Sequence, residues 1–238
     1  MSLIQCHRHT KEDLKLWEAY ERADLVYYEM NQTRIQEKIE KAIESIREFS
    51  KEPCYCGVSW GKDSLVVSHL VHLSGCEIPL VHISIEKLSN PYCKDVRDLY
   101  LKITNQKYYE IEINVSKNVK TGRLETGFKQ AKDLYGHYIS GVRKEESITR
   151  KISAKKHGVM TENACRPILD WTHKEVFAYL SHNDLPIHPT YSMFMNGKLD
   201  RQFLRVGSIG GERGREFGRL EFETFYYPDL LRRIEKTG

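Results

Sequence analysis

Short apolar stretches alternate with amphipathic stretches from Pro53 onward, and this alternation constrains the fold more than any other feature of the sequence. The predicted strands are Cys54–Ser59, Ile78–Ile85, Tyr108–Ile113 and His137–Val142, and the predicted helices are Ser64–Leu73, Tyr92–Ile103, Glu125–Leu134 and Glu145–Ser153. Strands separated by helices of this length pair in parallel through right-handed crossovers, and helices then cover both faces of the sheet. We therefore expect a three-layer α/β fold around a mostly parallel central sheet.

The first fifty residues have a purely helical pattern. Apolar residues recur at helical spacing from about Lys11 to Phe49, and no proline interrupts the run. A break near Asn31–Thr33 would give two helices. This segment could cover the main domain, or it could pair with a second copy of itself in a homo-oligomer.

The last third of the chain is less regular. Thr172–His182 is a predicted helix, because Thr172 and Glu175 have the spacing of a capping box. Beyond Pro186 the chain is rich in glycine and arginine, and a short helix is expected after Pro228. This glycine- and arginine-rich segment contains the glycines Gly207, Gly210, Gly211, Gly214 and Gly218 and the arginines Arg201, Arg205, Arg213, Arg215 and Arg219.

We thus expect three parts: an N-terminal helical extension (1–50), an α/β domain that carries the binding site (51–190) and a C-terminal segment (191–238) that packs on this site or caps it. A glycine-rich segment can close over phosphates as a lid, which we prefer to a role in binding nucleic acid. The mild net charge of +4 permits an anionic ligand but does not by itself favour nucleic acid.

Composition favours a cytoplasmic protein with no membrane partner. Hydrophobic residues make up 40% and charged residues 29% of the chain, which is ordinary for a globular domain. We find no apolar stretch long enough to span a bilayer and no signal-peptide core in the first ten residues. Six scattered cysteines are therefore expected to be reduced thiols.

The segment Ser59-Trp60-Gly61-Lys62-Asp63-Ser64 is the strongest candidate for a binding site. It lies between a predicted strand and a predicted helix, where unpaired backbone N–H groups bind phosphate well. Gly61 lets the backbone approach a ligand closely, Lys62 adds a positive charge, and both serines can donate hydrogen bonds. The simpler alternative is a plain strand-to-helix turn that carries a surface lysine.

This segment is not a Walker A loop, because Cys56 stands where that motif needs glycine and Asp63 follows the lysine where it needs Ser or Thr. Asp63 is unusual next to bound phosphate. It could cap the helix, or it could help to hold a Mg²⁺ ion that bridges to phosphate.

Two arginines, Arg143 and Arg150, form a second candidate site. Arg143 would lie at a strand end and Arg150 almost two turns along the helix that follows, so both could bind one phosphate or sulfate group. Glu145 and Glu146 fall in the first turn of this helix, where acids are favourable, and one of them could orient an arginine. The alternative is a solvated, charged helix start.

Three motifs together resemble the PP-loop, or N-type ATP pyrophosphatase, superfamily and its phosphoadenosine phosphosulfate (PAPS) reductase-like family. Ser59–Ser64 resembles the S-x-G-x-D-S loop, and Gly141–Arg150 resembles the G-x-R-x-E-E-S-x-x-R motif. Pro167–Thr172 with Val176 resembles the element P-L-x-D-W-T-x-x-D-V. The three motifs occur in the family's order between about Cys54 and Pro189.

The resemblance implies an adenine nucleotide α-hydrolase-like, Rossmann-like fold in which strand ends hold adenine and ribose. Cofactor-binding residues would then be Ser59, Trp60, Gly61, Lys62, Asp63, Ser64, Ser84, Gly141 and Arg143, and catalytic residues would be Lys62, Asp63, Arg143 and Arg150. Ser84 replaces the aspartate that often follows the second strand, with Glu86 close by, which leaves ribose or metal contacts there open.

The resemblance leaves the nucleotide open between ATP and PAPS. Lysine before Asp63 resembles members that cleave ATP between the α- and β-phosphates, whereas the later motifs resemble the reductases. The reductases carry a C-terminal cysteine nucleophile, and no cysteine follows Cys165 here. Without C-x-x-C or adjacent cysteines, we expect no iron–sulfur cluster. Cys54 and Cys56 are expected in the core, and Cys165 could be structural or an activated thiol.

Three functions remain open from the sequence. The first is an ATP-dependent enzyme, with Mg²⁺, that transfers an adenylyl group to an unknown acceptor and releases pyrophosphate. The second is a PAPS-binding protein of sulfur transfer or reduction that uses an external thiol. The third is a non-catalytic regulatory subunit that binds a nucleotide.

His69 and His72 on a predicted helix form no metal-ligand pattern, and Trp171 is expected in the core.

Overall fold

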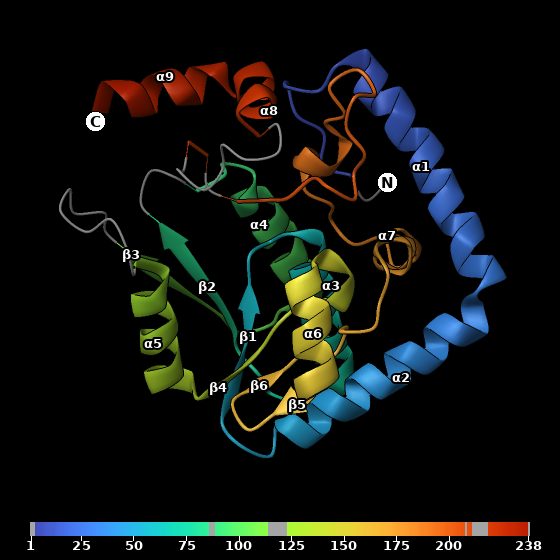
Figure 1. The fold of residues 1–238 in the computed structure, drawn as a ribbon, viewed down its shortest axis with the longest axis vertical. Coiled ribbons are helices and arrows are strands. Elements are labelled where there is room, and N and C mark those ends of the chain that lie inside the picture. Colours follow the sequence, from blue (N-terminus) through green and yellow to red (C-terminus); the bar gives the residue numbers. More distant parts are fainter. Residues whose placement is uncertain (1–2, 86–88, 114–122, 208, 211–218, 238) are drawn as a thin grey trace.

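A six-stranded sheet forms the centre of the protein (Figure 1). The computed structural model describes residues 3–85, 89–113, 123–207, 209–210 and 219–237. The strand order is β3-β2-β1-β4-β6-β5, and all neighbours pair in parallel except β5 and β6. The strands are β1 Cys54–Val58, β2 Leu80–Ile85, β3 Tyr108–Ile113, β4 His137–Ile139, β5 Met160–Thr161 and β6 Ala164–Cys165.

Helices lie on both faces of this sheet, which confirms the predicted three-layer α/β fold. On one face α3 packs on β1 and is itself covered by α2 and α7, while α5 packs over β1, β2 and β3 on the other face. The α-helices are α1 Lys11–Met30, α2 Gln32–Phe49, α3 Lys62–Ser74, α4 Cys93–Thr104, α5 Arg123–Tyr135, α6 Ile148–His157, α7 His173–His182, α8 Arg219–Tyr226 and α9 Pro228–Thr237. Two 3₁₀ turns, η1 Lys144–Glu146 and η2 Pro189–Ser192, complete the helical elements of the described residues.

The alternation of side chains along β1 divides the core in two. Cys54, Cys56 and Val58 point into the large core under α3, as expected for these two cysteines. Tyr55 points to the opposite face, where a small cluster with Val81, Ile111 and Ala131 forms under α5. The α5 side therefore buries much less of the sheet, and this leaves room there for a cavity.

The N-terminal helices cover the main domain. The predicted break is confirmed at Asn31, which ends α1 and precedes α2. Trp17 and Tyr28 of α1 and Ile35 of α2 are buried, and α1 runs along α7. Pairing with a second copy stays a prediction, for which the exposed side of α1 is available.

Polar contacts tie α1 to the C-terminal segment. The buried Arg201 guanidinium donates to the buried Asp24 carboxylate (Nη1 to Oδ2, 2.6 Å) and lies over the ring of Phe177. The buried Asp13 carboxylate accepts from the Tyr226 hydroxyl (3.0 Å). Buried, paired charges of this kind are costly to break, so they fix the segment against the rest of the chain.

The structure corrects several predicted boundaries. The helix expected over Glu145–Ser153 is instead the 3₁₀ turn η1 followed by α6, because Ser147 has an extended backbone (φ −165°) and caps α6. Helix α3 begins at Lys62 after the N-cap Gly61, two residues earlier than predicted, so Asp63 is not its cap. The predicted capping box of Thr172 and Glu175 is confirmed. Among the described helices, none is long and apolar enough to cross a membrane.

Candidate functional site

A cavity of about 810 Å³ lies over the α5 face of the sheet and is lined by residues of α5 and by Arg150 of α6. Its floor is made by alternate residues of two neighbouring strands, Tyr55, Gly57 and Ser59 from the β1 chain and Tyr138 and Ser140 from the β4 chain. The carboxyl ends of these strands, where α/β proteins bind ligands, form one end of the cavity. This size is in the ordinary range for sites that bind small molecules.

The loop Ser59–Ser64 forms that end of the cavity. Gly61 is the N-cap of α3 and makes no side-chain cap bond, so the helix start presents backbone amides. The Ser64 hydroxyl lies 3.2 Å from the Ser59 amide and 3.3 Å from the Ser59 hydroxyl. A buried tyrosine hydroxyl, that of Tyr191 in η2, accepts a hydrogen bond from the Lys62 amide (3.0 Å). The loop is thus ordered by its own serines and by one tyrosine from the C-terminal segment.

Asp63 lines the cavity and is held there between two cations. Its Oδ2 accepts a hydrogen bond from Lys62 Nζ (2.6 Å), and its Oδ1 accepts one from Arg143 Nε (2.7 Å). Arg143 is only 3% exposed and also donates from Nη1 to Glu145 Oε2 (2.7 Å) and to the carbonyl of Trp171. Burial lowers the pKa of the Lys62 ammonium, and the nearby Arg143 lowers it further.

Glu146 lies beside two further cations at the cavity, Arg150 and Arg205. It accepts a hydrogen bond from the Arg143 amide (3.1 Å), forms an ion pair with Arg150, and lies 3.6 Å from Arg205. Burial and the neighbouring Arg205 lower the pKa of the Arg150 guanidinium. Because positive charges outnumber their acidic partners here, an added anion would be stabilised.

The predicted residues therefore separate into two groups. Ser59, Asp63, Ser64, Gly141 and Arg150 line the cavity. Among the described residues, Trp60, Gly61, Lys62, Ser84 and Arg143 do not. The Trp60 ring is buried beside His82, Tyr100 and Tyr108, so only its backbone belongs to the loop. Ser84 is buried, whereas its strand neighbours His82 and Ile83 face the cavity. Glu86, Gly211, Arg213, Gly214, Arg215 and Gly218 lie outside the described residues.

Position 141 requires a glycine, because its backbone lies very close to the backbone of the Ser59–Ser64 loop. A Cβ atom at this position would lie 2.7 Å from the Asp63 carbonyl carbon and 2.9 Å from the Ser64 amide nitrogen. Both contacts are to backbone at the start of α3, which cannot move aside without shifting the loop. The motif glycine therefore permits the end of β4 to touch the phosphate-loop backbone.

Gly141→Ala is expected to destabilise the protein by about 1–3 kcal/mol, the usual cost of overpacking a well-packed contact. Urea unfolding followed by circular dichroism measures this change. Gly57→Ala is the matched control, since its Cβ would lie 3.7 Å from the nearest atom and 3.9 Å from the next. Equal stability of both variants would contradict this account of Gly141.

The interpretation of Cys165 as an activated thiol is wrong. Cys165 is fully buried, its Sγ lies 3.9 Å from the Ser45 carbonyl, and burial raises its pKa to about 12. A thiol with a raised pKa is neutral and unreactive near neutral pH. The structural alternative for Cys165, like the core placement of Trp171, agrees with the burial of both side chains.

Asp63 does not present a free carboxylate to a metal ion. Both of its oxygens accept hydrogen bonds from cations, and the described part of the chain contains no cluster of three His, Cys, Asp or Glu side chains that could hold a metal. The binding of Mg²⁺ by Asp63 therefore stays a prediction, and such an ion would share this carboxylate with Lys62 and Arg143.

Several residues of the site were missed from the sequence. Tyr191 and Arg205 come from the C-terminal segment, and Phe128, Lys129 and Lys132 come from α5. The one sequence feature that indicated a role for Arg205 at the site was the excess of arginine beyond Pro186. The position of Tyr191 against the Lys62 amide depends on a contact across 129 residues, for which the sequence has no local pattern.

A mostly parallel sheet whose first strand leads through Ser59–Ser64 into a helix N-terminus is the arrangement with which α/β proteins bind phosphate groups. Residues 135–211 match the phosphoadenosine phosphosulfate reductase domain. The chain is 26% identical over 223 residues to a PAPS reductase of Vibrio parahaemolyticus (84% of this chain and 80% of that one). It is 42% identical over 95 residues to a PAPS reductase of Vibrio cholerae (39% and 33%).

The chain is thus similar to PAPS reductases over most of its length, which agrees with the resemblance that the three motifs indicated. Among solved structures it is similar to an NMN synthetase of Francisella tularensis, with a TM-score of 0.47 and 13% identity over 85% of this chain and 94% of that one. It is also similar to an NH₃-dependent NAD synthetase of Campylobacter jejuni, with a TM-score of 0.47 and 17% identity over 85% and 92%.

Proposed function

We propose that this protein is an enzyme that binds ATP at Ser59–Ser64 and cleaves it between the α- and β-phosphates. An acceptor oxygen or other nucleophile would attack the α-phosphorus, the bond to the bridging oxygen would break, and pyrophosphate would leave. The observation that carries the proposal is the position of the loop. Its serines and the start of α3 close one end of a nucleotide-sized cavity next to four cations.

The β- and γ-phosphates would bind at the amides of the first turn of α3 and at the hydroxyls of Ser59 and Ser64. Lys62 is the first residue of this helix, and its ammonium would neutralise charge that develops on the leaving pyrophosphate. Arg150 would contact a phosphate from the opposite wall, since it lines the cavity. Catalysis would then consist mainly of positioning and charge neutralisation.

Arg143 and Asp63 would act as positioning residues. Arg143 is buried and all three of its side-chain hydrogen bonds described above go to the protein itself. Its charge contributes to the potential at the loop, and its bond to Asp63 fixes the first turn of α3. Asp63 in turn holds the Lys62 ammonium next to the loop.

A second candidate, the binding of PAPS for sulfur transfer with an external thiol, is favoured by the PAPS reductases named among the relatives. Arg150, which would contact a phosphate of ATP, also suits a sulfate group. The high pKa and burial of Cys165 mean that this thiol would not supply the nucleophile. A non-catalytic regulatory subunit remains the third candidate.

Calorimetric titration with ATP, with a non-hydrolysable ATP analogue and with PAPS tests the proposal. We expect tighter binding of ATP than of PAPS. Incubation with MgATP and a cell extract depleted of small molecules, followed by chromatography of the nucleotides, should give AMP and pyrophosphate rather than ADP. Tighter binding of PAPS, without any release of pyrophosphate, would favour the second candidate instead.

A further inference from the structure

Helix α6 supplies a residue of the site, but it rests on its own chain along one narrow side only. Arg150 lines the cavity from this helix, which has 10 residues and none that is fully buried. Its half-buried residues are Arg150, Ser153 and Ala154, and the others are exposed. A helix this short is marginally stable in water by itself, and helices in proteins gain most of their stability from packing. The outer side of α6 is therefore a candidate surface for a partner.

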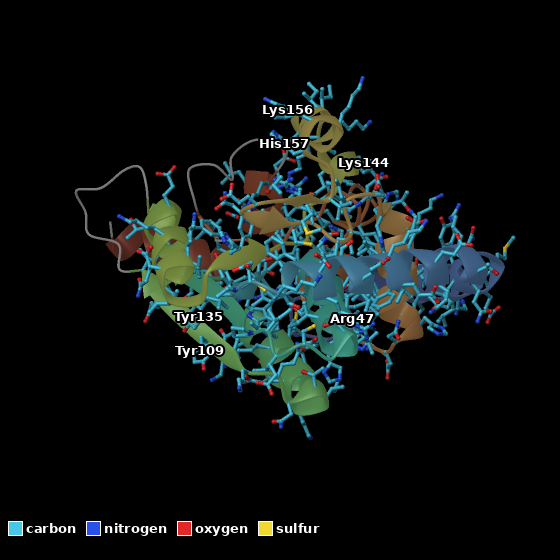
Figure 2. All side chains as sticks on the ribbon, turned by 90° about the horizontal axis from the view of Figure 1, so that it is seen from below. Arg47, Tyr109, Tyr135, Lys144, Lys156 and His157 are labelled. Atoms are coloured by element: carbon cyan, nitrogen blue, oxygen red, sulfur yellow. The ribbon has the colours of Figure 1, made fainter. Side chains whose placement is uncertain are left out.

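The outer side of α6 combines two exposed isoleucines with three lysines. Ile148 and Ile152 lie about one helical turn apart and are 78% and 65% exposed. Lys151, Lys155 and Lys156 border this pair, because residues three and four apart are neighbours on a helix. All three lysines are exposed, and none forms an ion pair with the described part of the chain. In Figure 2, Lys156 points away from the body of the molecule. An apolar pair with a basic rim suits a protein surface that has an apolar centre and acidic surroundings.

Helix α2 of the same chain has a surface that fits this description. Glutamates recur along its outer side at helical spacing, all of them exposed: Glu37, Glu40, Glu44 and Glu48. A hollow of about 350 Å³ lies beside the last three of them, with the half-buried Ile43 in its wall. The hollow is large enough to admit an isoleucine side chain. The outer side of α2 therefore offers an apolar centre with acidic surroundings.

The first three of these glutamates are available to cations of another molecule, since they form no ion pair within the described part of the chain. The two cations that line the hollow are already engaged within the chain. Arg47 Nε donates to the Ser74 carbonyl (3.0 Å), and Lys51 pairs with Glu48 (2.6 Å). The charge of this surface is therefore complementary to that of the lysines on α6.

The two surfaces lie at the same edge of the sheet, which suits a two-fold dimer. Helix α2 contacts β6, and α6 leads through β5 into β6, so both helices lie beside the β5–β6 edge (Figure 1). If α6 of one copy lies on α2 of a second copy, a two-fold axis places α6 of the second copy on α2 of the first. Both contacts then form together, and the dimer contains each of them twice.

We propose that two copies of this protein form a symmetric dimer in which α6 of each copy packs on α2 of the other. Ile148 and Ile152 would contact the hollow on α2, and the lysines of α6 would pair with Glu40 and Glu44. The apolar contact would supply most of the affinity, because exposed ion pairs contribute little free energy, whereas the charges would select this surface and its orientation. The partner copy would thereby fix the helix that carries Arg150 at the cavity. The dimer itself does not depend on the nucleotide proposed above.

Sedimentation velocity over a range of protein concentrations measures the dissociation constant of the dimer, and two charge-reversed variants test the proposal. The α6 triple variant is Lys151→Glu, Lys155→Glu, Lys156→Glu. The α2 triple variant is Glu37→Lys, Glu40→Lys, Glu44→Lys. Each variant alone should dimerise more weakly by about tenfold or more, because like charges then face one another. An equimolar mixture of the two should dimerise to within about threefold of the unmodified protein, since each α6 again meets an α2 of opposite charge.

Two further variants control for charge and test the apolar centre. Lys94→Glu, Lys102→Glu, Lys107→Glu makes the same change in net charge as the α6 triple variant, on exposed lysines of α4 and of the loop that follows it. Its dissociation constant should stay within about threefold of that of the unmodified protein. Ile148→Ser, Ile152→Ser should weaken the dimer by about tenfold or more, because it removes the apolar contact. Unchanged circular dichroism spectra show that the variants are folded, as expected for changes of exposed side chains.

Three results would overturn the proposal. The first is an unmodified protein that stays monomeric at every concentration. The second is a dimer that both triple variants retain and that Val26→Glu, Met30→Glu abolishes, which would place the contact on the exposed side of α1. The third is a mixture of the two triple variants that dimerises no better than each of them alone, which would show that these surfaces do not meet. All three would leave the proposed binding of ATP in place, because calorimetric titration tests that separately.

Discussion

Lys62→Met is expected to weaken the binding of ATP by about 10- to 100-fold while the binding of AMP changes less than threefold. We expect the ammonium, which pairs with Asp63 beside the loop, to turn to the β- and γ-phosphates, which AMP lacks. A charged hydrogen bond contributes about 1.5–3 kcal/mol. Methionine keeps the apolar stem, which is buried, so packing under the loop is preserved. Calorimetric titration of the unmodified protein and of Lys62→Met, each with α,β-methylene-ATP and with AMP, measures the two affinities.

The comparison of ATP with AMP separates a local loss of charge from a damaged fold. A collapsed loop would weaken the binding of both nucleotides, whereas loss of the ammonium alone weakens only that of ATP. Lys94→Met, an exposed lysine on α4, controls for the general effect of net charge. An unchanged affinity for ATP in Lys62→Met would remove Lys62 from the site.

Arg143→Met is expected to destabilise the protein by about 3 kcal/mol, which corresponds to a fall in Tm of about 6–12 °C for a chain of this size. Arg143 is almost fully buried, and its loss leaves the Asp63 Oδ1 and the Trp171 carbonyl without this donor. Thermal unfolding followed by circular dichroism measures the change. Nucleotide affinity should fall as well, because the first turn of α3 is no longer fixed.

The adjacent residue provides the control for this variant. Lys144 pairs with Asp170, but both side chains are about half exposed, and exposed pairs contribute only about 0–1 kcal/mol. Lys144→Met should therefore lower the Tm by no more than a few degrees. If Arg143 acts through Asp63, the double variant Arg143→Met, Asp63→Asn should be less destabilised than the sum of its parts. Strict additivity would contradict the positioning role.

The order of β1 to β4 and of α3 to α5 could be predicted, because apolar residues recur at strand or helix spacing in these parts of the sequence. The side chains of β1 alternate between the two cores, and α3 begins shortly after this strand. The position of the loop between them could therefore be predicted from the local sequence pattern. Strands β5 and β6 have two residues each, which is too short for any alternation. The boundary of α6 depended on the extended backbone of Ser147, which spacing alone cannot show.

The arrangement around Asp63 could not be predicted, since it depends on contacts between distant segments. Arg143 reaches Asp63 across 80 residues, and the sequence indicated only that both belong near phosphate. Arg143 and Lys62 do not line the cavity themselves but hold Asp63 at its wall, whereas Arg150 lines the cavity directly. Sequence spacing placed the charges near one another but could not assign them to these two roles.

A structure of the protein with α,β-methylene-ATP and Mg²⁺ tests the central claim most directly. We expect the β- and γ-phosphate oxygens within hydrogen-bond distance of the backbone amides in Gly61–Ser64 and of the Ser59 or Ser64 hydroxyl. The adenosine would then lie in the cavity over β1 and β4. Phosphates bound away from these amides, or a nucleotide bound outside this cavity, would contradict the claim.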